Sequence, residues 1–222
     1  MIAEQVFMDA RSANQPERGG SIPTAPLRKR EWIVRECHLD LAQQLVRRFH
    51  YAAGGSNTAV LTCGLWRVGE WLDADCYGAT WWLPPTKTAG ASVCPENPQR
   101  VLALSRVVCR PDRPENSCSF LIRHSMRFVD RARWPVLLSY ADCWRGHEGA
   151  IYKALADAGW QEDGYSKPER TYVKNGRMKS RKAGHRTRTH GEMLALGYEC
   201  VGAFRRKRFV NRIMAAQPQR GE

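Results

Sequence analysis

The apolar positions of the chain fall into short continuous runs that alternate with segments of helical spacing, and this alternation predicts an α/β fold. Residues 100–109, RVLALSRVVC, form an apolar and β-branched run typical of a strand covered on both faces. Residues 135–142, PVLLSYAD, form a second such run. Because a helical pattern follows each run after a short loop, the two units predict adjacent parallel strands joined by right-handed crossovers.

The N-terminal half adds elements to this sheet. Residues 31–55 begin as a strand near Trp32 and continue as a helix that ends at Gly54 and Gly55. Residues 58–86 hold apolar runs separated by Gly69 and acidic residues, which predicts a β-hairpin. The apolar face of the predicted helix consists of Leu41, Leu45, Val46 and Phe49.

Two helices are predicted after the central strands. The first follows a proline-rich loop and has Asn116 or Ser117 as its N-cap. The second spans residues 147–159, where Gly159 suits a left-handed C-terminal cap and Trp160 starts another extended segment. The predicted inward faces are Cys118, Leu121, Ile122, Ser125, Val129 and Ala132 in the first helix, and Ile151, Ala154, Leu155 and Ala158 in the second.

The composition is that of a globular protein with a strong positive charge. Of 222 residues, 43% are hydrophobic and 26% are charged, and the formal net charge is +13. No apolar run approaches the ~20 residues that cross a bilayer, so no membrane partner is expected. A basic field of this size attracts polyanions, which makes nucleic acid the first expected partner. An anionic membrane is a weaker alternative, because the sequence contains no clearly amphipathic basic helix.

Changes in composition predict three segments. Residues 1–30 are rich in Pro, Gly, Ser and charge and are predicted to form a flexible basic arm. Residues 31–166 form the predicted catalytic core, and residues 167–222 form a basic C-terminal segment with a final strand. The overall basicity favours DNA contact by this last segment over a solvated charged loop. The predicted contacts are Arg177, Lys179, Arg181, Lys182, Arg186, Arg188, Arg205, Arg206 and Lys207.

The cysteines do not predict a zinc finger or a disulfide framework. Eight are present, but no two have the CxxC spacing of common zinc sites. The first twenty residues have no basic segment followed by an apolar one, so no secretory signal is predicted and a reducing cytoplasm is the expected location.

The loop between Cys109 and Cys118 is a predicted anion site. It contains Arg110 and Arg113 and leads into a helix start, where free backbone N–H groups attract negative charge. A phosphate or pyrophosphate is the expected ligand. An ordinary strand-to-helix loop with an N-cap is the alternative.

Residues 150–164, AIYKALADAGWQEDG, resemble the closing motif of the GNAT acetyltransferase superfamily, in which a tyrosine-bearing helix ends in glycine before an aromatic residue. Tyr152 matches the tyrosine that in such enzymes often protonates the departing CoA thiolate, a step suited to a well-placed hydroxyl. By itself, a tyrosine on an apolar helix face is more often a core residue. The resemblance implies a mixed central sheet with helices on both faces, and acetyl-CoA or a related acyl-CoA as cofactor.

Three motifs together resemble the bacteriophage Mom DNA-modification family over about residues 45–165. They are HYAAGG at 50–55, LSRVVCRPDRPENSCSFLIRH at 104–124 and SYADCWRGHEGAIYKA at 139–154. The first lacks the serine that usually follows His-Tyr in the family. The resemblance implies transfer of a carbamoylmethyl-type group to the N6 amine of adenine in double-stranded DNA, which protects phage DNA from restriction in the host bacterial cytoplasm.

The residues carried over by this resemblance form a predicted catalytic set and a predicted cofactor set. The catalytic set is Asp142, His147, Tyr152, Ser139, Tyr140, His50 and Tyr51. The motifs give the cofactor residues Ser105, Arg106, Asn116 and Ser117, and the predicted cofactor set adds Val107 and Val108 of the same strand and Arg110 and Arg113 of the anion loop.

Chemistry assigns roles within these sets. The adenine amine is a poor nucleophile and gains from a group that accepts its proton, for which Asp142 and His147 are the best candidates. His50, Tyr51, Asp142 and His147 could instead bind divalent iron, because imidazole and carboxylate are suitable ligands. The alternative for Asp142 is a helix cap, and for His147 a surface residue.

The implied product and substrate add two requirements. The carbamoylmethyl group is attached through its CH2 carbon, whereas acyl transfer joins a carbonyl carbon, so a CoA-type fold alone does not explain the product. The base must also leave the duplex, which requires aromatic or apolar walls. Tryptophans available for this role are Trp66, Trp71, Trp81, Trp82 and Trp144, although most of them are expected in the core.

Two other functions fit the same features. One is an acyl-CoA-dependent N-acetyltransferase acting on RNA or protein amines, and the other is a non-catalytic basic DNA-binding protein with the same core. The sequence leaves the DNA recognition site and the oligomeric state open, with a homodimer as one alternative.

Overall fold

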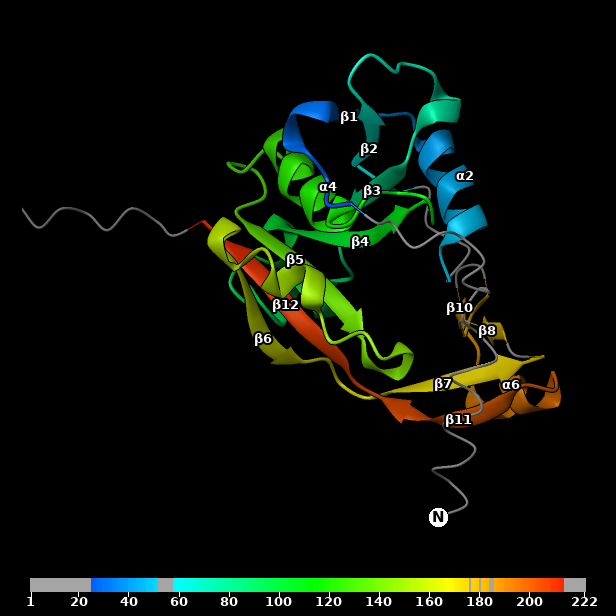
Figure 1. Cartoon of the computed structure of the whole chain (residues 1–222). Coiled ribbons are helices and arrows are strands. Elements are labelled where there is room, and N and C mark those ends of the chain that lie inside the picture. Colours follow the sequence, from blue (N-terminus) through cyan, green and yellow to red (C-terminus); the bar gives the residue numbers. More distant parts are fainter. Residues whose placement is uncertain (1–24, 52–57, 176, 180, 184–185, 214–222) are drawn as a thin grey trace, which may run out of the picture. The chain divides into compact units, whose positions relative to one another are not determined.

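A computed structural model describes residues 25–51, 58–175, 177–179, 181–183 and 186–213 of the chain (Figure 1). The chain divides into two compact units. The larger unit comprises residues 20–140, 149–164 and 208–222, and the smaller unit comprises residues 1–19, 141–148 and 165–207. Most of the predicted flexible arm, residues 1–24, lies outside the described residues, as does most of the motif at 50–55.

The larger unit is built on a seven-stranded sheet with the order β1-β2-β3-β4-β5-β12-β6 (Figure 1). The first four strands pair antiparallel, whereas β4 and β5 pair parallel, as predicted for the two central runs. The strands are β1 Trp32–Glu36, β2 Leu61–Arg67, β3 Gly78–Leu83, β4 Val101–Cys109, β5 Val136–Asp142, β6 Trp160–Tyr165 and β12 Arg206–Arg212.

Helices cover both faces of this sheet. In α2, Leu39–Phe49, the buried residues Leu41 and Val46 pack with Trp66 and Trp81 on one face. The neighbouring strand residue Leu65 points to the other face and packs with Phe120 and Leu121 of α4, Ser117–Ser125. Adjacent strand residues point to opposite faces, so β2 and β3 build both cores. The predicted mixed α/β sheet with helices on both faces is therefore confirmed.

The remaining helical segments of the larger unit are short. They are α3 Lys87–Ala91, α5 Ala150–Lys153 and the 3-10 turns η1 Lys29–Glu31, η2 Asp73–Asp75, η3 Pro98–Arg100, η4 Met126–Phe128 and η6 Ala156–Ala158. The backbone of residues 25–27 pairs with Glu115, so this end of the predicted arm is folded.

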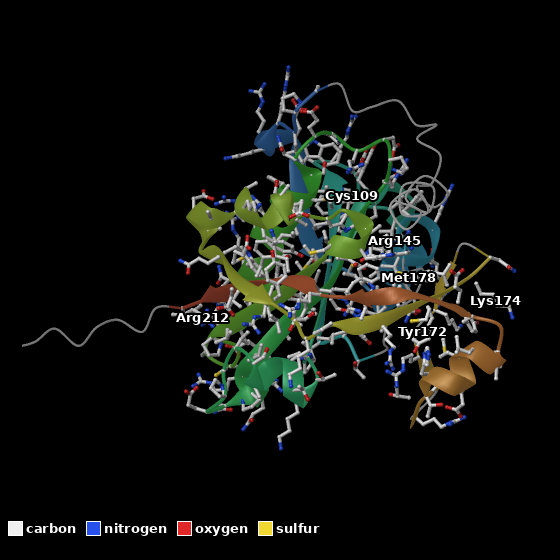
Figure 2. The ribbon with its side chains drawn as sticks, turned by 90° about the horizontal axis from the view of Figure 1, so that it is seen from below. Cys109, Arg145, Tyr172, Lys174, Met178 and Arg212 are labelled. Atoms are coloured by element: carbon white, nitrogen blue, oxygen red, sulfur yellow. The ribbon has the colours of Figure 1, made fainter. Side chains whose placement is uncertain are left out.

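The smaller unit contains a three-stranded antiparallel sheet with the order β11-β7-β8. Its strands are β7 Glu169–Lys174, β8 Arg177–Lys179 and β11 Glu199–Phe204, with β9 Lys182–Ala183 and β10 Arg186–Thr187 as a second pair. Its helical segments are the 3-10 turn η5 Cys143–Arg145 and α6 His190–Ala195. Tyr172 on β7 (Figure 2) and Met193 on α6 are fully buried, and the Tyr172 hydroxyl is hydrogen-bonded to His190 Nδ1 at 2.8 Å.

Several predicted elements differ from the structure. The helix expected to reach Gly54 ends at Phe49, and the helix expected to include Val129 and Ala132 ends at Ser125. The helix expected over 147–159 is reduced to α5 and η6, because Gly149, at φ 75°, is not helical and the first helix begins only after it. Ala154, expected to face inward, is exposed. β12 lies between β5 and β6, so those two strands are not neighbours. The C-terminal segment contains several strands rather than one final strand.

Candidate functional site

The parallel strands β4 and β5 separate halfway along their length. They pair at Val101–Val136, Leu102–Leu137 and Ala103–Leu138, and in these two fully described strands no further pair of residues continues the ladder. β4 nevertheless remains paired with β3 as far as Cys109. Beyond Ala103 the β5 side of β4 is therefore outside the ladder, where its backbone groups can bond to side chains, as the Leu104 carbonyl does to Ser139, or to a ligand.

A β-bulge at Ser105 accounts for this separation. Trp82 pairs with Leu104 and Trp81 with Arg106, so Ser105 is an extra residue in β4. Such a residue bends its strand, and bulges often lie beside functional sites. The predicted cofactor residues Ser105, Arg106, Val107 and Val108 all lie on this open part of the strand. The side chains of Val107 and Val108 pack in the cores on opposite faces, so only their backbone is offered to a ligand.

Ser139 and Tyr152 form a hydrogen-bonded pair where the strands separate. The Ser139 Oγ donates to the Leu104 carbonyl oxygen at 3.0 Å and lies 2.6 Å from the Tyr152 hydroxyl. A serine hydroxyl carries one hydrogen, so Tyr152 donates to Ser139 Oγ. Both side chains are buried, at 1% and 4% exposure. The structure thus brings together two predicted catalytic residues and a carbonyl that sequence reasoning missed.

The Tyr152 ring is held firmly by its neighbours. It stacks on Phe209 with ring centroids 4.8 Å apart and packs against Trp160 at 5.2 Å. Gly149, the residue before α5, has φ 75°, and a Cβ at this position would collide with the Phe209 ring. The glycine therefore allows the chain to turn tightly into α5 against Phe209.

Burial raises the pKa of Tyr152 to about 12, while the hydrogen bond with Ser139 opposes the shift. Tyr51 and Cys118 are close enough to raise this pKa further, because each would place a negative charge near the phenolate. Tyr152 consequently remains protonated at neutral pH and can act as a proton donor. The predicted residue Tyr51 is thus near Tyr152, and its ring stacks on His50 at 4.4 Å.

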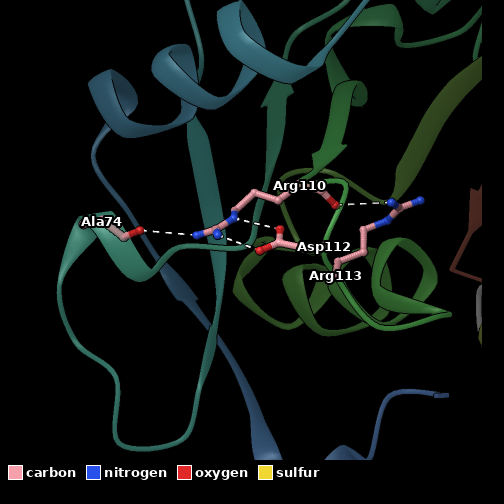
Figure 3. A network of polar contacts seen from close by, with 4 residues as sticks. All are labelled: Ala74, Arg110, Asp112 and Arg113. Atoms are coloured by element: carbon pink, nitrogen blue, oxygen red, sulfur yellow. Dashed lines mark hydrogen bonds and ion pairs between the residues drawn. The ribbon is translucent and has the colours of Figure 1, made fainter. Parts of the chain in front are cut away.

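The loop after β4 holds the two predicted anion-binding arginines differently (Figure 3). The Arg110 guanidinium binds both carboxylate oxygens of Asp112, at 3.0 and 2.7 Å, and these hydrogen bonds, together with its charge, lower the pKa of that carboxyl. Arg113 instead donates to the Arg110 carbonyl at 3.2 Å. Arg110 is therefore neutralised within the loop, which leaves Arg113 as the better cation for a phosphate.

The start of α4 completes this part of the site. Asn116, the N-cap residue, has φ 63° and ψ 6°, a left-handed conformation that asparagine tolerates better than most residues. Its side chain does not cap the helix. The hydroxyls of Ser117 and Ser119 donate to the carbonyls of Pro114 and Asn116. Within the described residues, the first-turn N–H groups from 117 to 119 have no hydrogen-bond acceptor and can bind an anion.

Two thiols flank this helix start. The Cys118 Sγ lies 3.4 Å from the Cys109 Sγ. The hydrogen bond between the two thiols lowers the pKa of Cys118, and the Arg113 guanidinium lowers it further. Burial instead raises the pKa of Cys37 and Cys63 to about 12. The sequence contained a signal for this pair, because Cys109 ends a strand and Cys118 starts the next helix, but the spacing alone matched no known motif.

Other predicted residues of the larger unit lie elsewhere. Tyr140 follows Ser139 on β5 and packs in the cluster of Val101 and Val210, on the opposite face. Trp66, Trp81 and Trp82 are core residues and are not available to stack on a base. Trp71 is 66% exposed, and the Arg35 guanidinium lies over its ring.

Asp142 and His147 belong to the smaller unit, at the two ends of a turn that contains η5. The His147 N–H donates to the Asp142 carbonyl at 3.1 Å, which closes this turn. His147 is exposed and Asp142 is half-buried. Their side chains are therefore accessible to a substrate from solvent.

The predicted DNA contacts that the structure describes differ in exposure. Lys179, Arg186, Arg205 and Arg206 are exposed, whereas Arg181 and Arg188 are half-buried. Arg186 and Arg206 form ion pairs with Glu192 and Glu169. Lys207 is buried and binds Glu148 at 3.1 Å. The side chains of Arg177 and Lys182 lie outside the described residues.

The predicted iron site has no support in the described part of the chain. No group of three or more His, Cys, Asp or Glu side chains is placed there to hold a metal ion. His50 and Tyr51 lie in the larger unit, and Asp142 and His147 lie in the smaller one. In the same described residues, no helix is long and apolar enough to cross a membrane.

Comparison with known proteins connects this geometry to one family. The model of the Mom protein family matches residues 31–209, which include every described residue of the candidate site. No curated protein matches the sequence.

Solved acetyltransferase structures show a weaker similarity. One is a Bacillus subtilis acetyltransferase in complex with CoA, with 7% identity and a TM-score of 0.46, covering 83% of this chain and 99% of that one. A GNAT-family acetyltransferase from Streptococcus pneumoniae has 11% identity and a TM-score of 0.46, covering 82% and 100%. The ribosomal-protein-S18-alanine N-acetyltransferase from Escherichia coli has 10% identity and a TM-score of 0.45, covering 84% and 97%. At these values the similarity carries no argument about cofactor or substrate.

Proposed function

This chain belongs to the Mom protein family, and we propose that it is an acyl-CoA-dependent transferase that modifies the N6 amine of adenine in double-stranded DNA. The observation that carries the proposal is the opening between β4 and β5, where Ser139 and Tyr152 form a buried hydrogen-bonded pair. Both residues lie within the segment matched by the family model, and Tyr152 also lies within the motif at 150–164 that resembles the acetyltransferases.

The residues around the opening fit an extended amide chain that ends in phosphates. The part of β4 that no longer pairs with β5, beyond Ala103, can hydrogen-bond amide groups of a ligand in the manner of a further strand. Arg113 and the N–H groups at the start of α4 can bind phosphate oxygens. When bound there, an acyl-CoA would supply an activated acyl group and a thiol leaving group. Arg110 contributes less, because Asp112 already neutralises it.

The chain's own residues then move two protons. Ser139, fixed by its hydrogen bond to the Leu104 carbonyl, holds the Tyr152 hydroxyl in place. Tyr152 would give its hydroxyl proton to the sulfur of the leaving thiol. Asp142 or His147 accepts the proton of the adenine amine. Attack of the amine on the thioester would join N6 to the acyl carbonyl carbon and break the C–S bond. The family's carbamoylmethyl product is joined through CH2 and would require a different donor, so the mass of the product distinguishes the two.

The smaller unit supplies the DNA contact in this proposal. Lys179, Arg186, Arg205 and Arg206 are exposed cations on or next to its strands. The ion pairs of Arg186 and Arg206 lie at the surface, where such pairs contribute about 0–1 kcal/mol and can be exchanged for phosphate. Lys207 is not included, because its ammonium is buried against Glu148.

The test is an analysis of nucleosides. Duplex DNA is incubated with the protein and a bacterial extract that supplies acyl-CoA, digested to nucleosides and analysed by mass spectrometry. A mass-shifted deoxyadenosine is expected. The treated DNA should also resist restriction enzymes whose recognition sequences contain the modified adenine. If acyl groups appear only on RNA or protein amines, the enzyme has a different acceptor. If DNA is bound but every nucleoside is unchanged, the protein is a DNA-binding protein without this activity.

A further inference from the structure

A surface pocket of about 300 Å³ lies entirely within the smaller unit. Its volume is at the lower end of the range of about 300–1,000 Å³ that small-molecule sites occupy. Four segments meet at it: the η5 turn, the end of β6, the end of β11 and the link to β12. The lining residues are Cys143, Trp144, Tyr165, Ala203, Phe204 and Arg205.

Three of the six lining residues are aromatic, and none of the three belongs to the described apolar cores. The rings of Trp144 and Phe204 lie 6.1 Å apart and are tilted by 52°, so they do not cover each other's faces. Tyr165 is 48% exposed. Trp144 and Phe204 are half-buried, and partly exposed aromatic rings of this kind can stack on a flat ligand ring.

Cations surround these rings. The Arg145 guanidinium (Figure 2) lies 4.6 Å from the centre of the Trp144 ring, and the Lys207 Nζ lies 5.8 Å from that of Tyr165. Arg205 lines the pocket directly. The segments 141–148 and 165–207 carry thirteen Lys or Arg and five Asp or Glu residues, a formal charge of +8. An aromatic pocket in such a field is complementary to a ring attached to a phosphate backbone, whereas an apolar peptide or lipid chain would use only the aromatic part.

The pocket also adjoins the turn that carries the predicted proton acceptors. Asp142 directly precedes the lining residues Cys143 and Trp144, and the His147 N–H closes the turn on the Asp142 carbonyl. A purine ring stacked on Trp144 would therefore be held beside the segment that contains these two side chains.

We propose that this pocket receives an adenine base that has left the DNA stack, with Trp144, Phe204 and Tyr165 as its aromatic walls and Arg205 beside its phosphate. The proposal deepens the function proposed above and rests on it, because it assigns the place where the acceptor base is held. The pocket lowers the free energy of the extrahelical base by replacing the stacking that the base gives up in the duplex.

The test compares the affinity of the protein for two duplexes of the same sequence. In one, a single adenine faces an abasic site and is already unstacked, and in the other it is paired with thymine. Extruding a paired base requires a few kcal/mol, so the wild-type protein should bind the first duplex about tenfold more tightly or better. Trp144→Ala and Phe204→Ala should each reduce this preference to about twofold or less, because neither variant retains the full stacking surface for the base.

Two controls keep this experiment decisive. Tyr165→Ala should also reduce the preference for the unpaired adenine. Because Tyr165 is half-exposed, this variant should fold even if Trp144→Ala or Phe204→Ala does not, and it then takes their place. Trp71→Ala removes an exposed tryptophan of the larger unit and should leave the preference unchanged. A wild-type protein without preference, or folded pocket variants that keep it, would overturn the proposal. Both of these results can be distinguished from failure of the proposed function. The nucleoside digest measures modification of DNA, and it does not depend on the ratio of the two duplex affinities.

Discussion

The two units of this chain handle polar groups in opposite ways. Leaving residues 1–19 aside, the smaller unit has a formal charge of +8 over 51 residues, against +6 over 152 residues in the larger one. The polar centre of the larger unit consists of neutral hydroxyls that are buried and bonded to each other, Ser139 and Tyr152. The smaller unit instead has exposed arginines and lysines around an aromatic pocket. In the proposed function, the buried proton donor Tyr152 therefore lies in the larger unit, and the exposed cations that contact DNA lie in the smaller one.

The physical reason lies in solvation. A buried hydroxyl keeps its proton and its orientation because water does not compete for it, as the raised pKa of Tyr152 shows. Cations that bind phosphate must remain in water until the ligand arrives, because burying an unpaired charge is unfavourable. Lys207 shows the other case: its ammonium is buried, and it is paired with Glu148.

The largest expected effect comes from breaking the buried pair. Tyr152→Phe removes the proton donor and should lower the rate of deoxyadenosine modification about a hundredfold or more. The phenyl ring still stacks on Phe209 and Trp160, so the fold should be retained, as circular dichroism and thermal unfolding can check. Tyr77→Phe, a matched change elsewhere in the larger unit, should keep the wild-type rate. Full activity in folded Tyr152→Phe would remove Tyr152 from the catalytic set.

The second prediction tests whether the difference in charge between the two units determines DNA binding. Replacing Lys179, Arg186 and Arg188 of the smaller unit with Gln should weaken DNA binding and reduce the slope of log affinity against log salt by about 0.9 for each phosphate that the protein no longer neutralises. The matched triple variant of the larger unit, with Gln at the exposed positions Arg47, Arg48 and Lys87, should keep the slope. Equal changes in both variants would show that the charge of the whole chain, not of the smaller unit, determines binding.

The smallest effect concerns the two thiols beside the proposed phosphate site. A thiolate forms above the pKa of its thiol, and the pKa of Cys118 is lowered by Cys109 and Arg113, so Cys118 should be alkylated by iodoacetamide at a lower pH than an ordinary cysteine. Cys37 and Cys63, with pKa values raised to about 12, should remain unlabelled at neutral pH. Peptide mass spectrometry measures the labelling of each residue.

Two variants and a ligand test this thiol assignment. Cys109→Ala removes the hydrogen bond to Cys118 and should move its labelling to higher pH. Saturating acetyl-CoA should slow the labelling of Cys118 if the start of α4 binds phosphate. Labelling that is the same with and without acetyl-CoA, in protein that is shown to bind it, would place the phosphates elsewhere.

Much of the larger unit could be predicted because its information is local. The runs at 100–109 and 135–142 are strands β4 and β5, and the apolar residues at 58–86 form the hairpin of β2 and β3. A continuous apolar run bounded by turn residues has few alternatives to a buried strand. The pairing of Ser139 with Tyr152 was not predicted as a contact, but both residues belong to the segments that the family motifs identified.

The features that the sequence did not predict have a different cause. The insertion of β12 between β5 and β6 joins strands that are more than 40 positions apart in the case of β6 and more than 60 in the case of β5, and pairing at such distances leaves no local pattern. The segment at 177–188 is so rich in charge that its short strands have no apolar alternation to reveal them. The pocket combines Trp144, one of five tryptophans that the sequence offered for stacking on a base, with Tyr165 and Phe204, which come from other segments and do not stand out in their own local context.

Apolar periodicity and motif order are properties of the chain itself, and they were sufficient to predict the mixed α/β sheet and the Mom family. Other features became visible only in the folded molecule: where β4 and β5 separate, which hydroxyl donates to which, and that aromatic side chains of the smaller unit gather into a pocket. These features depend on distances between residues that are remote in the chain, and such distances are set by the packing of the whole unit.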